Sequence, residues 1–265
     1  MKNRSITLGI VQMESTKDKA KNIEKLNNII NLREADLIIT PEYFMYNPTG
    51  DEPDRIYMMA EELDGAFASS LKELASKLGV HILATLFTPA SKPKVYNEAV
   101  IFSPKGEILL RYRKAHLFDA YDYRESEFML PGNAPSSIIE LKGTKISVAI
   151  CYDIRFPELF RTYALGGAEL VIVPSGWYRG DMKEEILHVL GRARAHENTI
   201  FIAIVNQYGK NFTGRSTIIG PMGEVIYDLG VGEKYREITI EVSEIEEVRR
   251  KLPMLKQRNT AVYKL

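Results

Sequence analysis

The chain has 265 residues, and its 35 Lys and Arg balance 35 Asp and Glu, so the formal net charge is zero. A balanced charge argues against nucleic acid or an anionic membrane as the main partner, because both attract a basic excess. The single cysteine excludes an intramolecular disulfide and fits a reducing compartment. The apolar runs are far shorter than a membrane-spanning helix, so we expect a cytoplasmic protein without a membrane partner.

The first half of the chain alternates short apolar segments with amphipathic ones. Ser15 or Thr16 is placed to cap one helix, and Asp64 to cap a second helix that runs to Lys77 and stops at Gly79. The apolar, β-branched segments predict strands at 6–12, 37–40, 81–87, 97–103 and 108–114.

The second half repeats this order of elements. Its helices are expected at 156–165, where Pro157 is tolerated in the first turn, at 182–198 and at 243–251. Its strands are expected at 145–151, 169–173, 199–206, 215–219 and 224–227.

Two pairs of segments match in detail and in the same order, which indicates a duplicated half-unit. ADLIITP at 35–41 is similar to AELVIVP at 168–174, and SPKGE at 103–107 is similar to GPMGE at 220–224. Each half then has a mixed sheet with helices on only one face, so stacking the bare faces buries both sheets. We therefore expect an α/β fold, a four-layer α-β-β-α sandwich, in one domain over 1–265. The C-terminal helix and tail, about 243–265, are expected to dock on a neighbour or a second subunit.

Cys151 lies where an apolar strand ends and a helix follows. A nucleophile at such a turn is exposed at the rim of the sheet, where backbone N–H groups can hold an oxyanion. A thiol near pH 7 is only a few per cent ionised, so a catalytic cysteine needs a base or a cation beside it. The alternative is a buried structural cysteine, since free Cys is among the most buried residue types.

Glu42 and Lys114 also follow predicted strands, and they are the candidates for base and cation. A carboxylate beside a thiol can move a proton, and an ammonium can stabilise an oxyanion. Taken singly, each residue is better explained without a function: Glu42 as a solvated loop carboxylate, and Lys114 as part of the exposed-looking run 111–114. Their spacing alone does not bring the three side chains together.

Three blocks of the chain, in this order, resemble the signature of the nitrilase superfamily: PEYF at 41–44, YRKAHLFD at 112–119 and CYDIRFPEL at 151–159. GRARAHEN at 191–198 is similar to the family's Arg-Ala-x-Glu-Asn helix end. The resemblance implies the same four-layer fold that the repeat predicts.

The resemblance also implies roles for the matching residues. Cys151 is then the nucleophile, Glu42 the general base and Lys114 the stabiliser of the oxyanion, with the backbone N–H of Tyr152 as second oxyanion donor. Attack on a carboxamide releases ammonia and leaves a thioester that water hydrolyses. No metal or organic cofactor is implied, and the sequence shows no metal-ligand spacing.

Many members of the family use a second glutamate ahead of a Pro-Gly step. Glu125 fits this position best, with Glu127 as the alternative. His116 belongs to the second block, and we expect it to have a structural hydrogen-bonding role.

The sequence after the nucleophile looks like the branch of omega-amidases and related Nit-type amidases. These hydrolyse small dicarboxylate monoamides such as 2-oxoglutaramate, or deaminated glutathione. N-carbamoyl and aliphatic amide hydrolases use the same triad and remain an alternative, as does a non-catalytic binding protein on the same fold. The partner is expected to be a small amide.

Arg155, four residues after the nucleophile, is a candidate to bind a substrate carboxylate in a bidentate manner. The alternative, favoured by the preference of Arg for buried ion pairs, is a structural pair with Asp153, Glu158 or Glu197. Aromatic residues that follow strand ends are further candidates for the pocket lining: Tyr46, Trp177 and Tyr208. Family members commonly pair through helices, so we expect a homodimer or higher homo-oligomer that uses 156–165 and the C-terminal segment.

Overall fold

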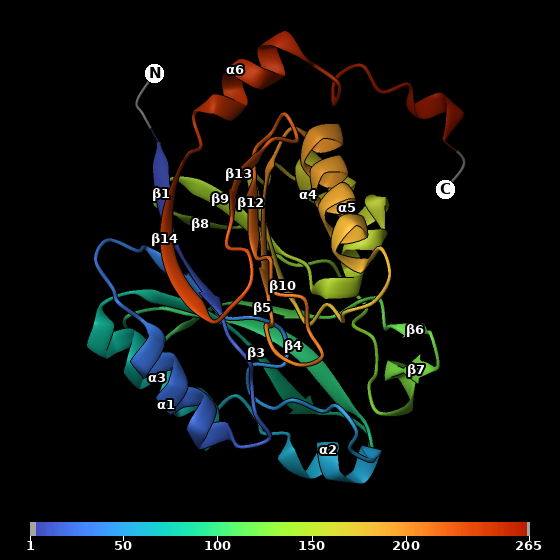
Figure 1. Ribbon diagram of the computed structural model, residues 1–265. Helices are drawn as coiled ribbons and strands as arrows, with labels where there is room; N and C mark the ends of the chain where they lie inside the picture. Colours follow the sequence, from blue (N-terminus) through green and yellow to red (C-terminus); the bar gives the residue numbers. More distant parts are fainter. Residues whose placement is uncertain (1–3, 264–265) are drawn as a thin grey trace.

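The computed structural model describes residues 4–263 and has four layers, with two six-stranded sheets between two layers of helices (Figure 1). The first sheet has the strand order β14 (Lys234–Glu241), β1 (Ser5–Gln12), β2 (Leu37–Ile39), β3 (His81–Pro89), β4 (Val95–Phe102), β5 (Ile108–Arg113). The second has the order β13 (Val225–Asp228), β12 (Thr217–Ile219), β11 (Phe201–Asn206), β10 (Leu170–Ser175), β9 (Thr144–Val148), β8 (Ile139–Leu141).

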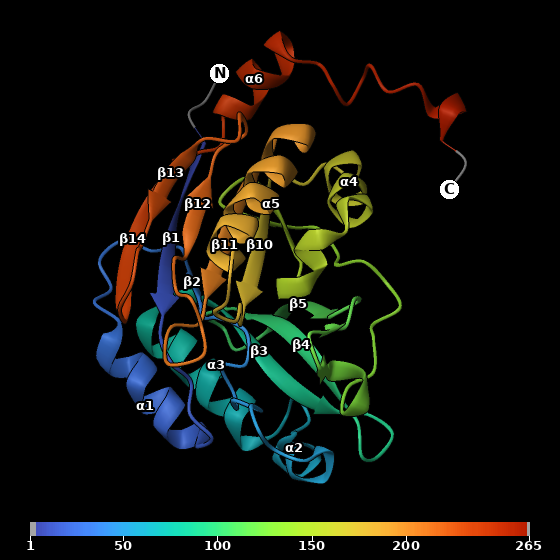
Figure 2. The ribbon, with the colours of Figure 1, turned by 45° about the vertical axis from the view of Figure 1, so that its right-hand side comes forward.

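The helices cover the outer faces of the two sheets. Two lie against the first sheet, α1 (Lys19–Ile29) and α3 (Ala66–Leu78), and two against the second, α4 (Pro157–Leu165) and α5 (Lys183–Asn198) (Figure 2). The remaining elements are α2 (Pro53–Met59), the hairpin of β6 (Asp119–Ala120) and β7 (Tyr123–Arg124), and α6 (Glu244–Lys251). The predicted α-β-β-α sandwich is confirmed.

The two sheets have the same topology. In each, three neighbouring strands run parallel (β1, β2, β3 and β9, β10, β11), and two antiparallel strands follow. The sixth strand differs in origin, because β8 immediately precedes β9, whereas β14 returns from the C-terminal end to pair with β1. Neither β8 nor β14 was predicted from the sequence. The return of β14 ties the end of the chain to the first sheet.

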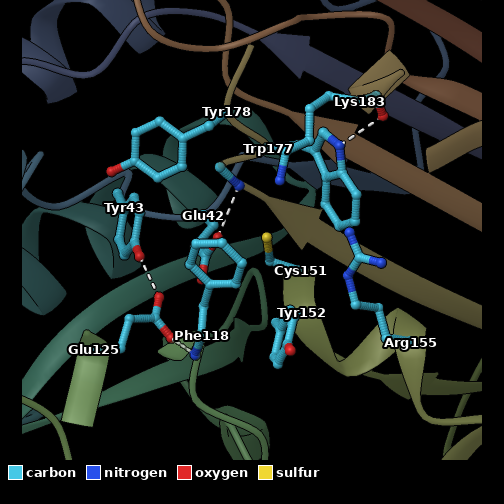
Figure 3. Close-up of a pocket in the computed structure, with 11 residues that line it drawn as sticks. Glu42, Tyr43, Phe118, Glu125, Cys151, Tyr152, Arg155, Trp177, Tyr178 and Lys183 are labelled. Carbon is cyan, nitrogen blue, oxygen red and sulfur yellow. Dashed lines mark hydrogen bonds between the residues drawn. The ribbon is translucent and has the colours of Figure 1, made fainter. Parts of the chain in front are cut away.

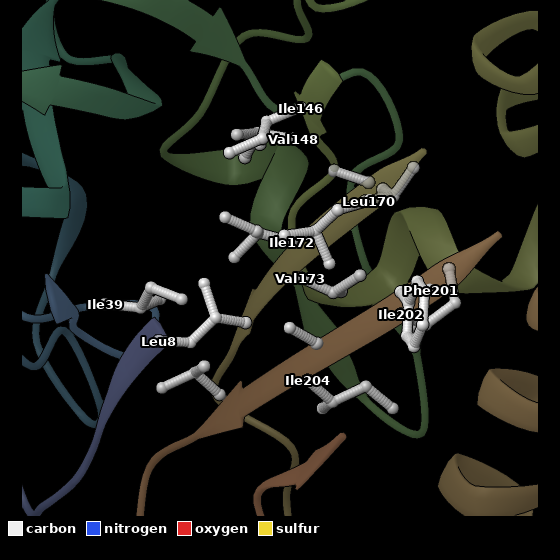
Figure 4. Packing of buried hydrophobic residues seen from close by; sticks show 14 of the residues in the cluster. Leu8, Ile39, Ile146, Val148, Leu170, Ile172, Val173, Phe201, Ile202 and Ile204 are labelled. Carbon is white, nitrogen blue, oxygen red and sulfur yellow. The ribbon is translucent and has the colours of Figure 1, made fainter. Parts of the chain in front are cut away.

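Alternation along the strands of the first sheet explains how both of its faces are buried. Leu8 and Ile39 point toward the second sheet and pack in one apolar cluster with Ile172 and Ile204 (Figure 4). Ile38, between two inward residues, belongs instead to the cluster that includes the helices of the first half. Full burial of each such side chain contributes about 1.5–3 kcal/mol.

The first helix begins later than its hydroxyl residues suggested. Its cap is Asp18, whose carboxylate accepts backbone N–H groups of the first turn. Thr16 is unavailable for that role because its hydroxyl and backbone N–H both bond the side chain of Asn22. The caps expected at Ser15 or Thr16 were therefore wrong by two or three residues.

The second helix ends as predicted but begins differently. Gly79 adopts a left-handed φ of 67° at the C-terminal end of α3, a conformation that glycine takes without steric cost. The N-terminal cap is Gly65 rather than Asp64, and no side chain caps it.

Both ends of the described chain lie at the end of the molecule away from α2 (Figures 1 and 2). After α6 the segment 252–263 extends from the body of the fold toward the side of α4. Within residues 4–263, no helix combines the length and the apolar character needed to cross a membrane.

Candidate active site

Cys151 lies at a strained turn rather than at the end of a strand. β9 stops at Val148, and Cys151 begins a short 3-10 helix, Cys151–Arg155, with a left-handed φ of 44°. Such a φ is unfavourable for a residue with a side chain, and strain of this kind is concentrated at functional sites. The thiol is nearly buried and lines a pocket between the two sheets' ends (Figure 3).

Asp153 holds this turn, a role that the sequence analysis missed. Its Oδ2 accepts hydrogen bonds from the Ile150 N–H at 2.8 Å and from the Tyr112 hydroxyl at 2.7 Å. Its Oδ1 accepts the backbone N–H of His116 at 3.0 Å and lies 2.7 Å from His116 Nδ1. One fully buried carboxylate therefore joins the second and third signature blocks, which contain Lys114 and Cys151.

Glu42 lies on the same pocket and is fully buried. Its Oε1 accepts hydrogen bonds from Lys114 Nζ and Asn97 Nδ2, both at 2.8 Å, and its Oε2 accepts the Gly176 N–H at 2.7 Å. Burial raises the pKa of Glu42 above its ordinary value, although the charge of Lys114 opposes this. Glu42 is thus a carboxylate of increased basicity held in one orientation.

Lys114 bridges two buried glutamates. Its ammonium donates to Oε1 of Glu42 and to Oε1 of Glu125, each at 2.8 Å. Glu125 also accepts the Phe118 N–H at 2.7 Å and a short hydrogen bond from the hydroxyl of Tyr43. Burial alone lowers the pKa of Lys114, but the charges of the two glutamates raise it well above its ordinary value, so the ammonium is retained.

The second glutamate of the site is Glu125. It begins a 3-10 turn after β7 and is almost completely buried, whereas Glu127 is exposed to solvent. The nearby Pro131-Gly132 step also has a physical reason: the Gly132 N–H donates to the Lys114 carbonyl, and a Cβ at Gly132 would lie 2.3 Å from the Arg113 carbonyl oxygen.

The electrostatics of the site keep the proton on sulfur at rest. Burial raises the pKa of the Cys151 thiol well above its ordinary value, and the charge of Glu42 raises it further. Transfer of that proton to Glu42 creates a thiolate while removing a carboxylate charge, so the net charge of the buried group does not change. The positive charge of Lys114 then stabilises the negative charge of the thiolate.

The pocket holds about 340 Å³, its open mouth included. The residues that line it are Glu42, Tyr43, Phe118, Glu125, Cys151, Tyr152, Arg155, Gly176, Trp177, Tyr178 and Lys183. Aromatic rings form much of the wall, and carboxylates and cations lie on different sides of Cys151 (Figure 3).

Arg155 has no carboxylate partner among residues 4–263. Its guanidinium lies over the ring of Trp177, 4.9 Å from the ring centre, and 5.7 Å from that of Tyr152. Asp153 is occupied as described, and Glu197 pairs with Arg194 at 2.9 Å. The structural ion pair considered for Arg155 is therefore not formed.

Of the three candidate aromatic residues, only Trp177 lines the pocket. Tyr46 is fully buried elsewhere, and its hydroxyl bonds the carboxylate of Asp51. Tyr208 lies beneath the guanidinium of Arg179, 5.6 Å from ring centre to carbon. Lining residues that the sequence analysis did not single out are Tyr43, Phe118, Tyr178 and Lys183; Lys183 could have been noticed as a cation at the start of a predicted helix.

No group of three or more His, Cys, Asp or Glu side chains arranged to hold a metal ion is found in the described part of the chain. The pocket that contains Cys151 is lined instead by two cations, Arg155 and Lys183, and by Glu42 and Glu125, which share the ammonium of Lys114. The chemistry available to this pocket is proton transfer and nucleophilic attack by sulfur.

A family model described as carbon-nitrogen hydrolase matches residues 7–250. The chain belongs to the carbon–nitrogen hydrolase family. Its resemblance to the nitrilase superfamily, noted from the sequence blocks, is confirmed, and the chain is a hydrolase of carbon–nitrogen bonds that depends on a cysteine.

Curated relatives cover nearly the whole chain. "Omega-amidase NIT2" of Danio rerio is 31% identical over 97% of this chain and 95% of its own length. "2-oxoglutaramate amidase" of Bacillus subtilis is 35% identical over 94% of this chain and 95% of its own length. "Deaminated glutathione amidase" of Escherichia coli O157:H7 is 32% identical, covering 86% of each chain.

Solved structures of carbon–nitrogen hydrolases share the fold. The carbon-nitrogen hydrolase of Helicobacter pylori G27 superposes with a TM-score of 0.89 at 25% identity, over 98% of this chain and 97% of that one. A variant of the amidase of Nesterenkonia sp. AN1 superposes with a TM-score of 0.84 at 25% identity, over 99% of this chain and 97% of that one. In that variant the acetamide moiety of fluoroacetamide is added covalently at the active-site cysteine.

Proposed function

We propose that the protein is an amidase that hydrolyses a small dicarboxylate monoamide, such as 2-oxoglutaramate, through a thioester on Cys151. The observation that carries the proposal is the buried chain of hydrogen bonds from Glu42 through Lys114 to Glu125, beside a thiol held at a strained turn. A protein that only binds ligands has no need for this arrangement, which costs desolvation of three charges.

The first half-reaction forms the thioester. Sγ of Cys151 attacks the amide carbon as Glu42 takes the thiol proton, and the carbonyl oxygen becomes an oxyanion. Lys114 Nζ and the Tyr152 N–H are the donors to that oxyanion. Glu42 then gives its proton to the amide nitrogen, the carbon–nitrogen bond breaks, and ammonia leaves.

The second half-reaction releases the acid. Glu42 takes a proton from water as the water oxygen attacks the thioester carbon, and the same donors receive the oxyanion. The carbon–sulfur bond breaks, and the thiolate recovers the proton from Glu42. Glu125 acts through Lys114, because its carboxylate keeps the ammonium charged and in place to donate to the oxyanion.

Two observations support a substrate that carries a carboxylate. Arg155 reaches the pocket without a carboxylate partner in the described chain, and a guanidinium binds a carboxylate through two parallel hydrogen bonds. One relative is named 2-oxoglutaramate amidase, and another is named an omega-amidase, the branch that the sequence after Cys151 resembles. We take 2-oxoglutaramate as the first substrate to test.

An ammonia-release screen tests the proposal directly, with the Cys151→Ala protein as blank. The screen compares dicarboxylate monoamides, N-carbamoyl amino acids, simple aliphatic amides and nitriles. We expect the highest kcat/KM with a dicarboxylate monoamide. Preference for an N-carbamoyl compound or a neutral amide would overturn the substrate, and a thiol inert toward iodoacetamide with no turnover of any compound would overturn the enzyme.

We also propose a cytoplasmic homodimer or higher homo-oligomer. A nucleophilic thiol must remain reduced, which favours the cytoplasm. The outer surface of α4 and the segment after α6 lie side by side around a shallow groove, and this is the surface that we expect a second copy to cover. Light scattering after size exclusion tests this, since a species with the mass of one chain would contradict it.

A further inference from the structure

We propose that Lys183 is a specificity residue that, together with Arg155, forms a two-cation subsite for the carboxylate of the substrate. The inference rests on the proposed function and deepens it, because it assigns the anionic end of the substrate to a defined pair of side chains.

The fold places Lys183 on the pocket rather than in solvent. It is the first residue of α5, and its carbonyl accepts a 2.8 Å hydrogen bond from Nε1 of Trp177, the ring over which Arg155 lies. Its ammonium lies 3.9 Å from the ring centre of Tyr121 and 5.5 Å from that of Phe118. Aromatic faces attract a cation without neutralising it, so they position the ammonium and leave its charge available.

Neither cation is neutralised by a carboxylate in the described part of the chain. Glu184, the acidic residue next to Lys183, is directed elsewhere: its oxygens lie 4.0 Å from Arg179 and 3.5 Å from Arg215. Burial, and then the charge of Arg155, lowers the pKa of Lys183. Two cations without carboxylate partners repel each other in a partly buried pocket. A bound carboxylate offsets this repulsion, so the pair favours binding of an anion.

The position of the pair sets the orientation of the substrate. Figure 3 shows Lys183 and Arg155 on the side of Cys151 away from Glu125. The two buried glutamates repel a substrate carboxylate, whereas the two cations attract it. A dicarboxylate monoamide is therefore held with its amide toward Lys114 and its carboxylate toward Lys183 and Arg155.

The test compares two amides with the same five-carbon chain, glutaramate, which ends in a carboxylate, and pentanamide, which ends in a methyl group. In Lys183→Met, which removes the charge but keeps an unbranched side chain one atom shorter, the ratio of kcat/KM for glutaramate to that for pentanamide should fall about tenfold or more, mainly through KM. Lys183→Arg should restore most of the ratio. Lys105→Met, at an exposed turn between β4 and β5, is the matched control and should leave the ratio unchanged.

Binding of glutarate provides a readout that does not depend on turnover. Calorimetry with Cys151→Ala should give a Kd for glutarate that increases about tenfold when Lys183→Met is added. An unchanged ratio and an unchanged Kd would overturn the subsite, and so would an equal loss with both amides, which signals a structural role. If the wild-type protein turns over no amide, the proposed function fails, while the Kd still decides the subsite.

Discussion

The two half-units share one topology but supply different chemistry to the site. The repeated apolar strand ends in Pro41-Glu42 in the first half and in Pro174-Ser175 in the second. Glu42 directs its carboxylate into the pocket, whereas the Ser175 hydroxyl bonds the Val173 carbonyl within its own strand. The second half contributes the next backbone group instead, the Gly176 N–H that holds Glu42.

The strands that begin each half differ in the same way. β9 leads to the strained, nearly buried Cys151, whereas the equivalent β1 leads to Met13, which is fully buried in the core beneath the helices. Neither half contains all three of Glu42, Lys114 and Cys151, because the base and the ammonium come from the first half and the nucleophile comes from the second. The duplication supplies the geometry, and divergence at equivalent strand ends supplies the reaction.

The largest loss of activity is expected from removing the nucleophile, which the second half contributes. Cys151→Ala takes away the only atom that can form the thioester, so ammonia release should fall to the level of the enzyme-free blank. Because the strained turn is held by Asp153 and not by the sulfur, the circular dichroism spectrum should match that of the wild type. Residual turnover above the blank would mean that another group makes the covalent bond.

Glu42→Gln removes the base while preserving its shape, and Ser175→Ala is the matched substitution at the equivalent strand end. The first should lower kcat by about 10²–10⁴, the usual contribution of general acid–base catalysis. The second should change kcat by less than about threefold, since that hydroxyl serves only its own strand. Similar losses in the two variants would show that the halves are not specialised as described.

Lys114→Met tests the other group from the first half. A decrease in kcat of about 10²–10³ is expected for loss of one oxyanion donor. Steady-state kinetics at saturating substrate measures it, and thermal denaturation provides the control, because Glu42 and Glu125 are left buried without their shared cation. A decrease confined to KM would assign Lys114 to substrate binding instead.

The sequence predicted the sandwich because hydrophobic periodicity and the internal repeat report burial, and burial determines the layers. It placed Glu42, Lys114 and Cys151 through blocks that resemble a family, not through spacing. β14 was missed because its partner, β1, lies more than two hundred residues away, and pairing at that range leaves no local signal. Asp153 was missed because its function is a set of hydrogen bonds to its own turn and to Tyr112 and His116, about forty residues earlier, which only the folded chain displays.

The smallest effect should come from a contact that joins the two half-units outside the pocket. Arg4, just before β1, forms a bidentate pair with Glu169, just before β10, at 2.8 and 3.0 Å, and Glu169 also accepts the Lys145 N–H. Burial raises the pKa of Glu169, but these partners outweigh it and lower the pKa below its ordinary value. The pair therefore stabilises the fold above the pKa of an unfolded glutamate, and this contribution disappears as the pH falls through the lower, folded value.

Glu169→Gln should lower the free energy of unfolding by about 1 kcal/mol at neutral pH, with a smaller difference in acid, while kcat stays at the wild-type value. Urea denaturation at the two pH values measures this, and a fall in kcat at unchanged stability would show that the junction between the halves also sets the geometry of the reaction.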